Sequence, residues 1–475
     1  MAHTGNLMAE MDLKPWLARA VDAIRDWEAS WGPYPPHPSL QVDPHELEAA
    51  LNRYLERLRG NYPFFHPRYA GQMLKPPHPV AVIGYLAAQL INPNNHALDG
   101  GPPTGEMEKE VVRALAAMLH LPETTLGHLT GGGTMANLEA LWVARCLHPG
   151  RGVAFSREAH YTHGRMSGVL QLEAVEVPTD AEGRMDLEAL EAMLRTGRIG
   201  TVVLTAGTTG RGVVDPIADA LPLCRRYGCR VHVDAAYGGF FALLAHADAP
   251  ELAPDTRRHL KAMADCDSVA IDPHKHGLQP YGCGAILFRD PSVGRFYRHD
   301  SPYTYFTSDA LHLGEISLEC SRAGAAAGAL WLTLQVLPLA ADRGLGPILA
   351  ACLRAAHRWA ALLETSEVLR LVQQPELDIL TFYPVPLTST ASAVDAASQR
   401  LFQEAMQDAD DPVFISVLRL RTEALRHRWP TLQADRREAR VLRSVLMKPE
   451  HETYVSHLHE RLEQLARRIQ TATKA

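Results

Sequence analysis

The chain has 475 residues, 46% hydrophobic and 21% charged, which is enough for one large domain and a smaller one, each with its own core. A formal net charge of −7 without a dense basic patch argues against nucleic-acid binding. The seven scattered cysteines indicate neither a disulfide framework nor a zinc ribbon. The N-terminus lacks a secretory-signal pattern and no run of roughly 18 apolar residues predicts a membrane span, so we expect a cytoplasmic protein.

Apolar residues recur at helical spacing from Trp16 to Trp27, which predicts polar helices in the first 60 residues. A Pro-rich break follows. We place an N-terminal helical and extended segment at residues 1–85. This segment is too short for an independent α/β domain, and it could pack on a partner subunit.

Residues 86–345 predict a large α/β domain. Its short β-branched runs lie at residues 153–155, 175–177, 201–205, 230–233, 268–271 and 285–288. Helical patterns lie between them, for example at residues 187–194 and 217–227. Such alternation predicts a mainly parallel sheet with helices on both faces, whose ligand binds beyond the carboxyl ends of the strands.

Residues 346–475 predict a small C-terminal α+β domain. A long helix is expected at residues 345–363, and strand-like runs follow at residues 379–383, 414–417 and 441–447. The last element is an amphipathic helix. Its apolar face carries Leu458, Leu462, Leu465 and Ile469.

The segment Asp-Pro-His-Lys-His at residues 272–276 directly follows the predicted strand 268–271. A lysine in this position is expected to be partly desolvated. Burial favours the neutral, nucleophilic amine that forms a Schiff base with a carbonyl. The alternative for Lys275 on its own is an ordinary lysine in a solvated loop.

Asp234 lies 41 residues before Lys275, in His-Val-Asp-Ala-Ala-Tyr-Gly-Gly at residues 232–239, and it ends another predicted strand. A pyridine cofactor needs a carboxylate against its ring nitrogen, because a protonated nitrogen makes the ring an electron sink. The small residues that follow would let the backbone approach a flat ring. The alternative for Asp234 is a helix N-cap.

Two segments are candidates for binding a phosphate. Thr-Gly-Gly-Gly-Thr at residues 130–134 opens a predicted helix through residue 147, and backbone N–H groups at a helix N-terminus favour an anion. Gly-Thr-Thr at residues 207–209 follows the strand 201–205. A flexible turn is the alternative for the glycine run. His160, just after the strand 153–155, could stack on a cofactor ring or be structural.

The order of these motifs, together with Ser-Arg at residues 321–322, resembles the group II pyridoxal phosphate (PLP)-dependent amino acid decarboxylases of the aminotransferase-like fold type I. The resemblance covers roughly residues 60–345. Within this group the chain is most similar to the bacterial tyrosine decarboxylases. Four segments carry that similarity, at residues 92–95, 127–130, 137–142 and 272–275 with 280–281.

The resemblance implies PLP as cofactor, an L-amino acid as substrate and a homodimer with its active site between subunits. The implied cofactor-binding residues are Lys275, Asp234, His160, Gly133, Thr134, Thr209, His232, Ala236, Asp272 and His274. Arg322 would be structural support near the site. A loop tyrosine, Tyr303 or Tyr305, would join Lys275, Asp234 and His160 as catalytic residues, because it would protonate the product carbon.

Two departures leave the substrate open. Many aromatic decarboxylases have Asn-Pro-His-Lys-Trp, whereas this chain has Asp272 and His276, and an acidic residue is unfavourable beside a phosphate. The chain is also shorter than typical bacterial tyrosine decarboxylases. We expect decarboxylation of an aromatic, tyrosine-like amino acid to the amine and CO2. The alternatives are glutamate or another amino acid as substrate, and an aldehyde-forming or carbon–carbon lyase reaction.

A metal hydrolase is the remote alternative. His232 and Asp234 share one face of a strand, and the pairs 160/163 and 274/276 are also histidines at ligand-like spacing. This interpretation leaves Lys275 and the glycine segment without a function, so we expect no metal.

Overall fold

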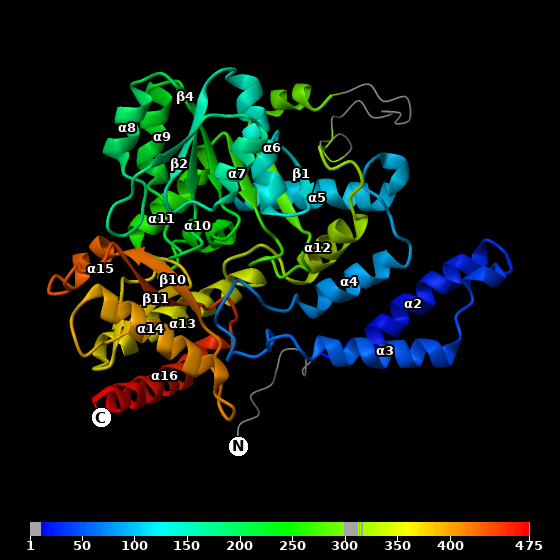
Figure 1. Cartoon of the computed structure of the whole chain (residues 1–475). Coiled ribbons are helices and arrows are strands. Elements are labelled where there is room, and N and C mark those ends of the chain that lie inside the picture. Colours follow the sequence, from blue (N-terminus) through cyan, green and yellow to red (C-terminus); the bar gives the residue numbers. More distant parts are fainter. Residues whose placement is uncertain (1–10, 299–311, 313, 315–316, 475) are drawn as a thin grey trace.

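The computed structural model describes residues 11–298, 312, 314 and 317–474. Its centre is a seven-stranded sheet with the order β1-β7-β6-β5-β4-β2-β3 (Figure 1). The strands are β1 Leu126–Thr130, β2 Gly152–Ser156, β3 Ala174–Val177, β4 Ile199–Thr205, β5 Arg230–Asp234, β6 Ser268–Ile271 and β7 Gly284–Phe288. Only β7 runs antiparallel to its neighbours in this sheet, so the predicted mainly parallel sheet is confirmed.

Helices cover both faces of this sheet (Figure 1). They are α5 Pro102–Met118, α6 Gly133–Leu147, α7 Thr162–Val169, α8 Leu187–Leu194, α9 Ile217–Arg226, α10 Ala242–His246, α11 Pro254–Lys261 and α12 Gly324–Val336. Strand β4 shows how one strand contributes to both sides. Val202 and Leu204 pack in the core with α5 and α8–α11, whereas Val203 packs with Leu141 of α6.

A second, four-stranded sheet is wholly antiparallel, with the order β10-β11-β9-β8. Its strands are β8 Leu369–Leu371, β9 Ile379–Pro384, β10 Ser416–Arg421 and β11 Glu438–Val445. Its helices are α13 Leu345–Thr365, α14 Ala391–Gln407, α15 Thr422–Arg428 and α16 His451–Lys474. The four apolar residues predicted on the last helix are all buried in one cluster. The small α+β unit is therefore confirmed, while the domain boundaries stay a prediction.

Three details of the expected strands need correction. Strand β1 was not predicted because Gly-His-Leu-Thr lacks a β-branched run, and β8 is only three residues long. The run expected at 414–417 begins as a strand at Ser416. Phe414 instead makes an isolated parallel bridge with Tyr69, which ties the segment before α4 to the small sheet.

The N-terminal helices are α2 Leu13–Ser30, α3 Pro44–Leu58 and α4 Pro79–Gln89. Asp12 and Asp43 cap α2 and α3 through their carboxylates. Helices α2 and α3 project from the rest of the chain (Figure 1). No helix of the described residues is long and apolar enough to span a membrane. The 3₁₀ turns within the described residues are Pro38–Leu40, Leu98–Gly100, Gly239–Phe241, Ala262–Asp265 and Pro291–Phe296.

Candidate active site

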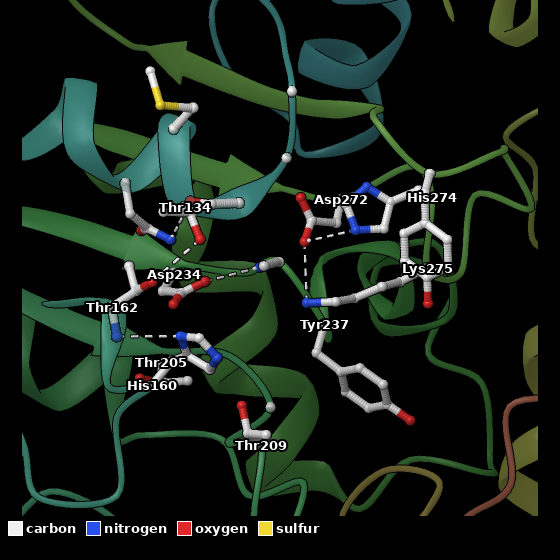
Figure 2. Close-up of a pocket in the computed structure, with 18 of the residues that line it drawn as sticks. Thr134, His160, Thr162, Thr205, Thr209, Asp234, Tyr237, Asp272, His274 and Lys275 are labelled. Atoms are coloured by element: carbon white, nitrogen blue, oxygen red, sulfur yellow. Dashed lines mark hydrogen bonds and ion pairs between the residues drawn. The ribbon is translucent and has the colours of Figure 1, made fainter. Parts of the chain in front are cut away.

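A pocket of about 400 Å³ lies at the carboxyl ends of β4, β5 and β6, where the sheet topology predicts a ligand (Figure 2). Nine of the ten predicted cofactor-binding residues line it, the exception being His232. They are Lys275, Asp234, His160, Gly133, Thr134, Thr209, Ala236, Asp272 and His274. Residues 130–134, 160, 207–209, 234–236 and 272–275 are thus brought together from five separate segments.

Lys275 points its amine into this pocket from the turn after β6 (Figure 2). The Nζ atom lies 3.0 Å from Asp272 Oδ2, and the lysine side chain is 20% exposed. Asp272 is almost completely buried, and its Oδ1 atom has no hydrogen-bond partner in the described residues. The lysine is thus held by an ion pair at the mouth of the pocket and is not a freely solvated loop residue.

Asp234, at the end of β5, is held by His163 of α7. His163 Nε2 donates to Asp234 Oδ2 over 2.9 Å, and the backbone N–H of Ala236 donates to Oδ1 over 3.2 Å. Burial alone would raise the pKa of Asp234. The hydrogen bond and charge of His163, followed by the charge of Lys275, outweigh burial and hold this pKa well below its usual value of 3.8. Asp234 is an ionised carboxylate facing the pocket. The next helical turn begins only at Gly239 and has Gly238 as its N-cap, so Asp234 is not a helix N-cap.

His163 was weighed from the sequence only as a metal ligand. Its role as the partner of Asp234 has no local sequence signal, because the two residues are 71 positions apart. Within the described residues, no group of three or more His, Cys, Asp and Glu could hold a metal ion. His276 points away from the pocket, with its Nε2 atom 2.8 Å from Asp378 Oδ2.

His232 is not among the residues that line the pocket, which corrects the prediction. It lies two residues before the end of β5, on the same face of the strand as Asp234, and it is buried. Burial lowers the pKa of His232 to about 3, so the ring is neutral. Nε2 donates to Asn137 Oδ1 over 2.8 Å, and Asn137 Nδ2 in turn donates to Gly133 O over 2.8 Å. His232 therefore positions the start of α6.

The N-terminus of α6 is open toward the pocket. Its N-cap is Gly132, with φ +140° and no side-chain cap. A Cβ added to Gly133 would lie 2.9 Å from Asp272 Oδ2 and 3.2 Å from Ala236 Cβ, so glycine keeps this space free. Free N–H groups at a helix start favour an anion. Thr134 lies beside them, and its Oγ1 atom is 3.2 Å from Thr162 Oγ1.

The opposite wall carries further hydroxyl groups. Thr209 and Thr205 both line the pocket, and Thr205 Oγ1 is buried without a hydrogen-bond partner in the described residues. Gly207 has φ +93°, and a Cβ there would lie 2.9 Å from Leu377 Cδ1. The pocket thus offers an amine, a buried carboxylate, an uncapped helix start and an unpartnered hydroxyl. Together these groups fit the aldehyde, the pyridine nitrogen and the phosphate of PLP.

Two histidines complete the pocket. His160 lies below Asp234 with its ring toward the cavity, and its Nδ1 accepts from the N–H of Thr162 over 3.3 Å (Figure 2). His274 Nδ1 donates to Cys283 O over 2.8 Å, and its ring centroid is 5.0 Å from that of Tyr281. Burial lowers the pKa of both histidines. Both rings are therefore favoured in the neutral form.

Arg443 of β11 is a candidate carboxylate-binding residue that the sequence did not predict. Its Nε donates to Gly210 O and its Nη1 to Gly71 O, both over 3.1 Å. Its Nη2 atom is buried without a hydrogen-bond partner, and no carboxylate of the described residues forms an ion pair with this guanidinium. Gly210 directly follows Thr209 of the pocket. A buried, unpaired cation beside the pocket is suited to a bound carboxylate.

Arg322 forms a buried ion pair with Glu108 of α5, and it also donates to Leu129 O and Asn95 O, both over 2.9 Å. Burial alone would raise the pKa of Glu108, but the charge of Arg322 outweighs it and lowers the pKa to about 2. This arrangement fits the support role implied for Arg322. Tyr303 and Tyr305 lie outside the described residues.

The family described as the pyridoxal-dependent decarboxylase conserved domain matches residues 63–384, which is more than half of the chain. The protein therefore belongs to the pyridoxal-dependent decarboxylase family. It is a PLP-dependent carboxy-lyase that acts on an amino acid, and the predicted enzyme class and cofactor are confirmed.

Among curated relatives, the L-tyrosine decarboxylase of Enterococcus faecium is 27% identical over 77% of this chain and 77% of its own length. The L-2,4-diaminobutyrate decarboxylase of Rhizobium meliloti is 32% identical over 64% of this chain and 63% of its own. Among solved structures, Oryza sativa TDC with PLP and tryptamine has a TM-score of 0.77 at 19% identity and covers 97% of this chain and 98% of that one. This likeness confirms the fold.

Proposed function

We propose that the enzyme decarboxylates an aromatic, tyrosine-like L-amino acid to the corresponding amine and CO2. The observation that carries this proposal is the chemistry of the pocket wall. Its described lining contains Tyr237, Tyr281 and Met135, and Lys275 is its one Lys or Arg side chain. A substrate with a second carboxylate would need a further cation there. The similarity to the Enterococcus faecium tyrosine decarboxylase supports the same substrate class.

When bound, PLP supplies an electron-poor ring that accepts the electron pair released as CO2 leaves. Each role of the chain's own residues is part of the proposal. Lys275 would hold the cofactor through its amine, and the substrate amine would displace that amine and leave it free in the pocket. Asp234, kept ionised by His163, stabilises the protonated ring nitrogen. His160 would stack on the ring, and the start of α6 with Thr134 and Thr209 would hold the phosphate.

Arg443 is proposed to bind the α-carboxylate of the substrate, since its unpaired guanidinium lies next to the loop of Thr209. Fixing this carboxylate orients the bond that breaks relative to the cofactor ring. His160 or a tyrosine at 303 or 305 then returns a proton to the product carbon. Asp272 is proposed to hold the Lys275 amine by its ion pair without contacting the phosphate.

The test is a panel of L-tyrosine, L-aspartate, L-glutamate and L-2,4-diaminobutyrate, assayed for CO2, amine, aldehyde and peroxide. We expect amine from tyrosine with a kcat/KM at least tenfold above that of the acidic substrates. A preference for aspartate, as in the name of the Pyrococcus abyssi relative, would contradict the aromatic assignment. Aldehyde and peroxide in place of amine would contradict simple decarboxylation.

A matched pair of variants tests the carboxylate role. Arg443→Met should raise KM for the amino acid by about tenfold to a hundredfold, the equivalent of one lost charge-assisted hydrogen bond. Arg440→Met, on the same strand but paired with Asp395, should leave KM near the wild-type value. Equal KM values for both variants would contradict the proposal that Arg443 binds the α-carboxylate of the substrate.

We also propose that the enzyme is a homodimer. Helices α2 and α3 project from the chain with exposed large apolar side chains, which need a partner surface. These side chains include Trp16, Trp27, Leu47, Leu51 and Tyr54. Light scattering after size-exclusion chromatography should give twice the chain mass of 52.3 kDa, and a monomer would contradict the proposal.

A further inference from the structure

A second cavity, of about 100 Å³, lies apart from the active site and contains two lysines. Lys75 lies before α4, and Lys448 follows β11 on the small sheet. Phe65, Leu278 and Ile348 form apolar walls together with several prolines. None of the residues that line this cavity lines the active-site pocket or is used in the proposed decarboxylation.

Neither ammonium group in this cavity has a carboxylate counterion among the residues that the structure describes. Lys448 is 4% exposed, and its Nζ donates to Tyr69 O over 2.6 Å. Lys75 Nζ donates to Met447 O over 3.2 Å. Neither lysine forms an ion pair with a carboxylate of the described residues, although Glu450 is part of the cavity wall. An ammonium has three N–H donors, so two on each lysine remain for a ligand.

The electrostatic balance of the cavity favours an anion. Burial, followed by the positive charge of Lys75, lowers the pKa of Lys448 to about 7, and Glu450 and Cys352 act in the opposite direction. Burial also lowers the pKa of Lys75. Two like charges that are desolvated together destabilise each other, and a negative ligand between them would offset that cost.

We propose that this cavity binds a small organic monocarboxylic acid with an apolar body. Its carboxylate accepts hydrogen bonds from Lys75 and Lys448, and its apolar body packs on Phe65, Leu278 and Ile348. The two ammonium groups repel a third, so the site discriminates against free amino acids and favours acids without an amine. The apolar walls discriminate against small hydrated anions such as acetate.

The cavity touches the turn that carries the catalytic lysine. Leu278 has φ +62°, its N–H donates to Lys275 O over 3.3 Å, and its own O accepts from the N–H of His78 over 2.8 Å. An acid packed on Leu278 therefore contacts the far end of the turn that begins at Asp272. The proposed site lies outside the pocket, so its ligand does not compete with the amino acid substrate.

Calorimetric titration of the holoenzyme at pH 7 with benzoate tests the proposal, with benzamide and acetate as probes that lack the charge or the apolar body. We expect one benzoate per chain and at least tenfold weaker binding of the other two. Lys448→Met and Lys75→Met should each weaken benzoate binding at least tenfold. Lys261→Met, which removes an exposed lysine paired with Asp248, should leave it unchanged.

If either buried-lysine variant does not fold, Ile348→Trp provides an independent test, because it fills the cavity from α13 and leaves both lysines in place. It should abolish benzoate binding. Benzoate affinity should also fall between pH 6 and pH 9, as Lys448 loses its proton. Absent binding to the wild-type enzyme, unchanged binding to Lys448→Met or to Ile348→Trp, or benzoate inhibition that is competitive with the amino acid would each overturn the proposal.

Discussion

Replacing His163 with phenylalanine tests how the site keeps Asp234 ionised. The ring volume is largely kept, but the donor that lies 2.9 Å from Asp234 Oδ2 is removed. His163 Nδ1 has no partner in the described residues, so this substitution leaves no other polar atom there unpaired. Both side chains are buried, and losing a hydrogen bond to a charged group of this kind costs about 1.5–3 kcal/mol.

The expected effect can be converted to a melting temperature. An unfolding entropy of about 2.1 cal/mol/K per residue gives roughly 1 kcal/mol/K for a chain of this length, so the midpoint should fall by about 1.5–3 °C. The assay is differential scanning calorimetry of the apoenzyme at pH 7. The melting temperature of the holoenzyme should fall less. In the proposed arrangement the protonated ring nitrogen of PLP also neutralises the charge of the Asp234 carboxylate.

The pH dependence of this loss follows from the depressed pKa of Asp234. Stability from such a carboxylate is present above its unfolded value of 3.8 and is lost as the pH falls through the lower folded pKa. Without His163, burial raises this pKa again, so the difference between variant and wild type should be largest near neutral pH and shrink toward pH 4.

The control is His427→Phe, which removes a histidine from an exposed pair with Glu182. Exposed pairs contribute about 0–1 kcal/mol, so its midpoint should stay within about 1 °C of the wild type. A His163→Phe apoenzyme that melts within 0.5 °C of the wild type at pH 7, by rough analogy with surface substitutions, would refute the reasoning.

Three further predictions concern other buried charges. Asp272→Asn removes a negative charge beside the helix start that is proposed to bind the phosphate, so the Kd for PLP in equilibrium titrations should fall about tenfold, and a higher Kd would contradict this. Glu108→Gln should lower the apoenzyme midpoint by roughly 3–5 °C because it leaves Arg322 buried and unpaired, and adding Arg322→Met should recover part of the loss. Buried and half-buried histidines with depressed pKa values are neutral when folded and take up protons on unfolding, so calorimetry near pH 5 should show an uptake of roughly three protons or more, and an uptake below one would contradict it. The histidines with the largest such shifts include His232, His246 and His312.

The sheet could be predicted from the sequence where buried strands carry β-branched runs, as in β4 and β5. It could not be predicted at β1, which lacks a run of β-branched residues and pairs only with β7 in the sheet. The pocket could be predicted because Asp234 and Lys275 directly end or follow strands, and parallel strands bring such positions to one edge.

The remaining residues depend on long-range packing that sequence patterns do not encode. His163 reaches Asp234 across 71 residues, and Arg443 reaches Gly210 across 233. His232 was misplaced because strand alternation gives the face of a side chain but not its depth below the strand end. The ion pair of Asp272 with Lys275 likewise follows from the tight turn after β6, which the sequence does not specify.

The most direct test of the account is the visible absorption spectrum of the purified protein with PLP, before and after borohydride reduction, followed by peptide mass spectrometry. The account predicts a yellow band that reduction removes, with one pyridoxyl group attached to the peptide that contains Lys275, and neither feature in Lys275→Ala. A protein that gains no band with added PLP, or a reduced adduct on any other lysine, would contradict the central claim.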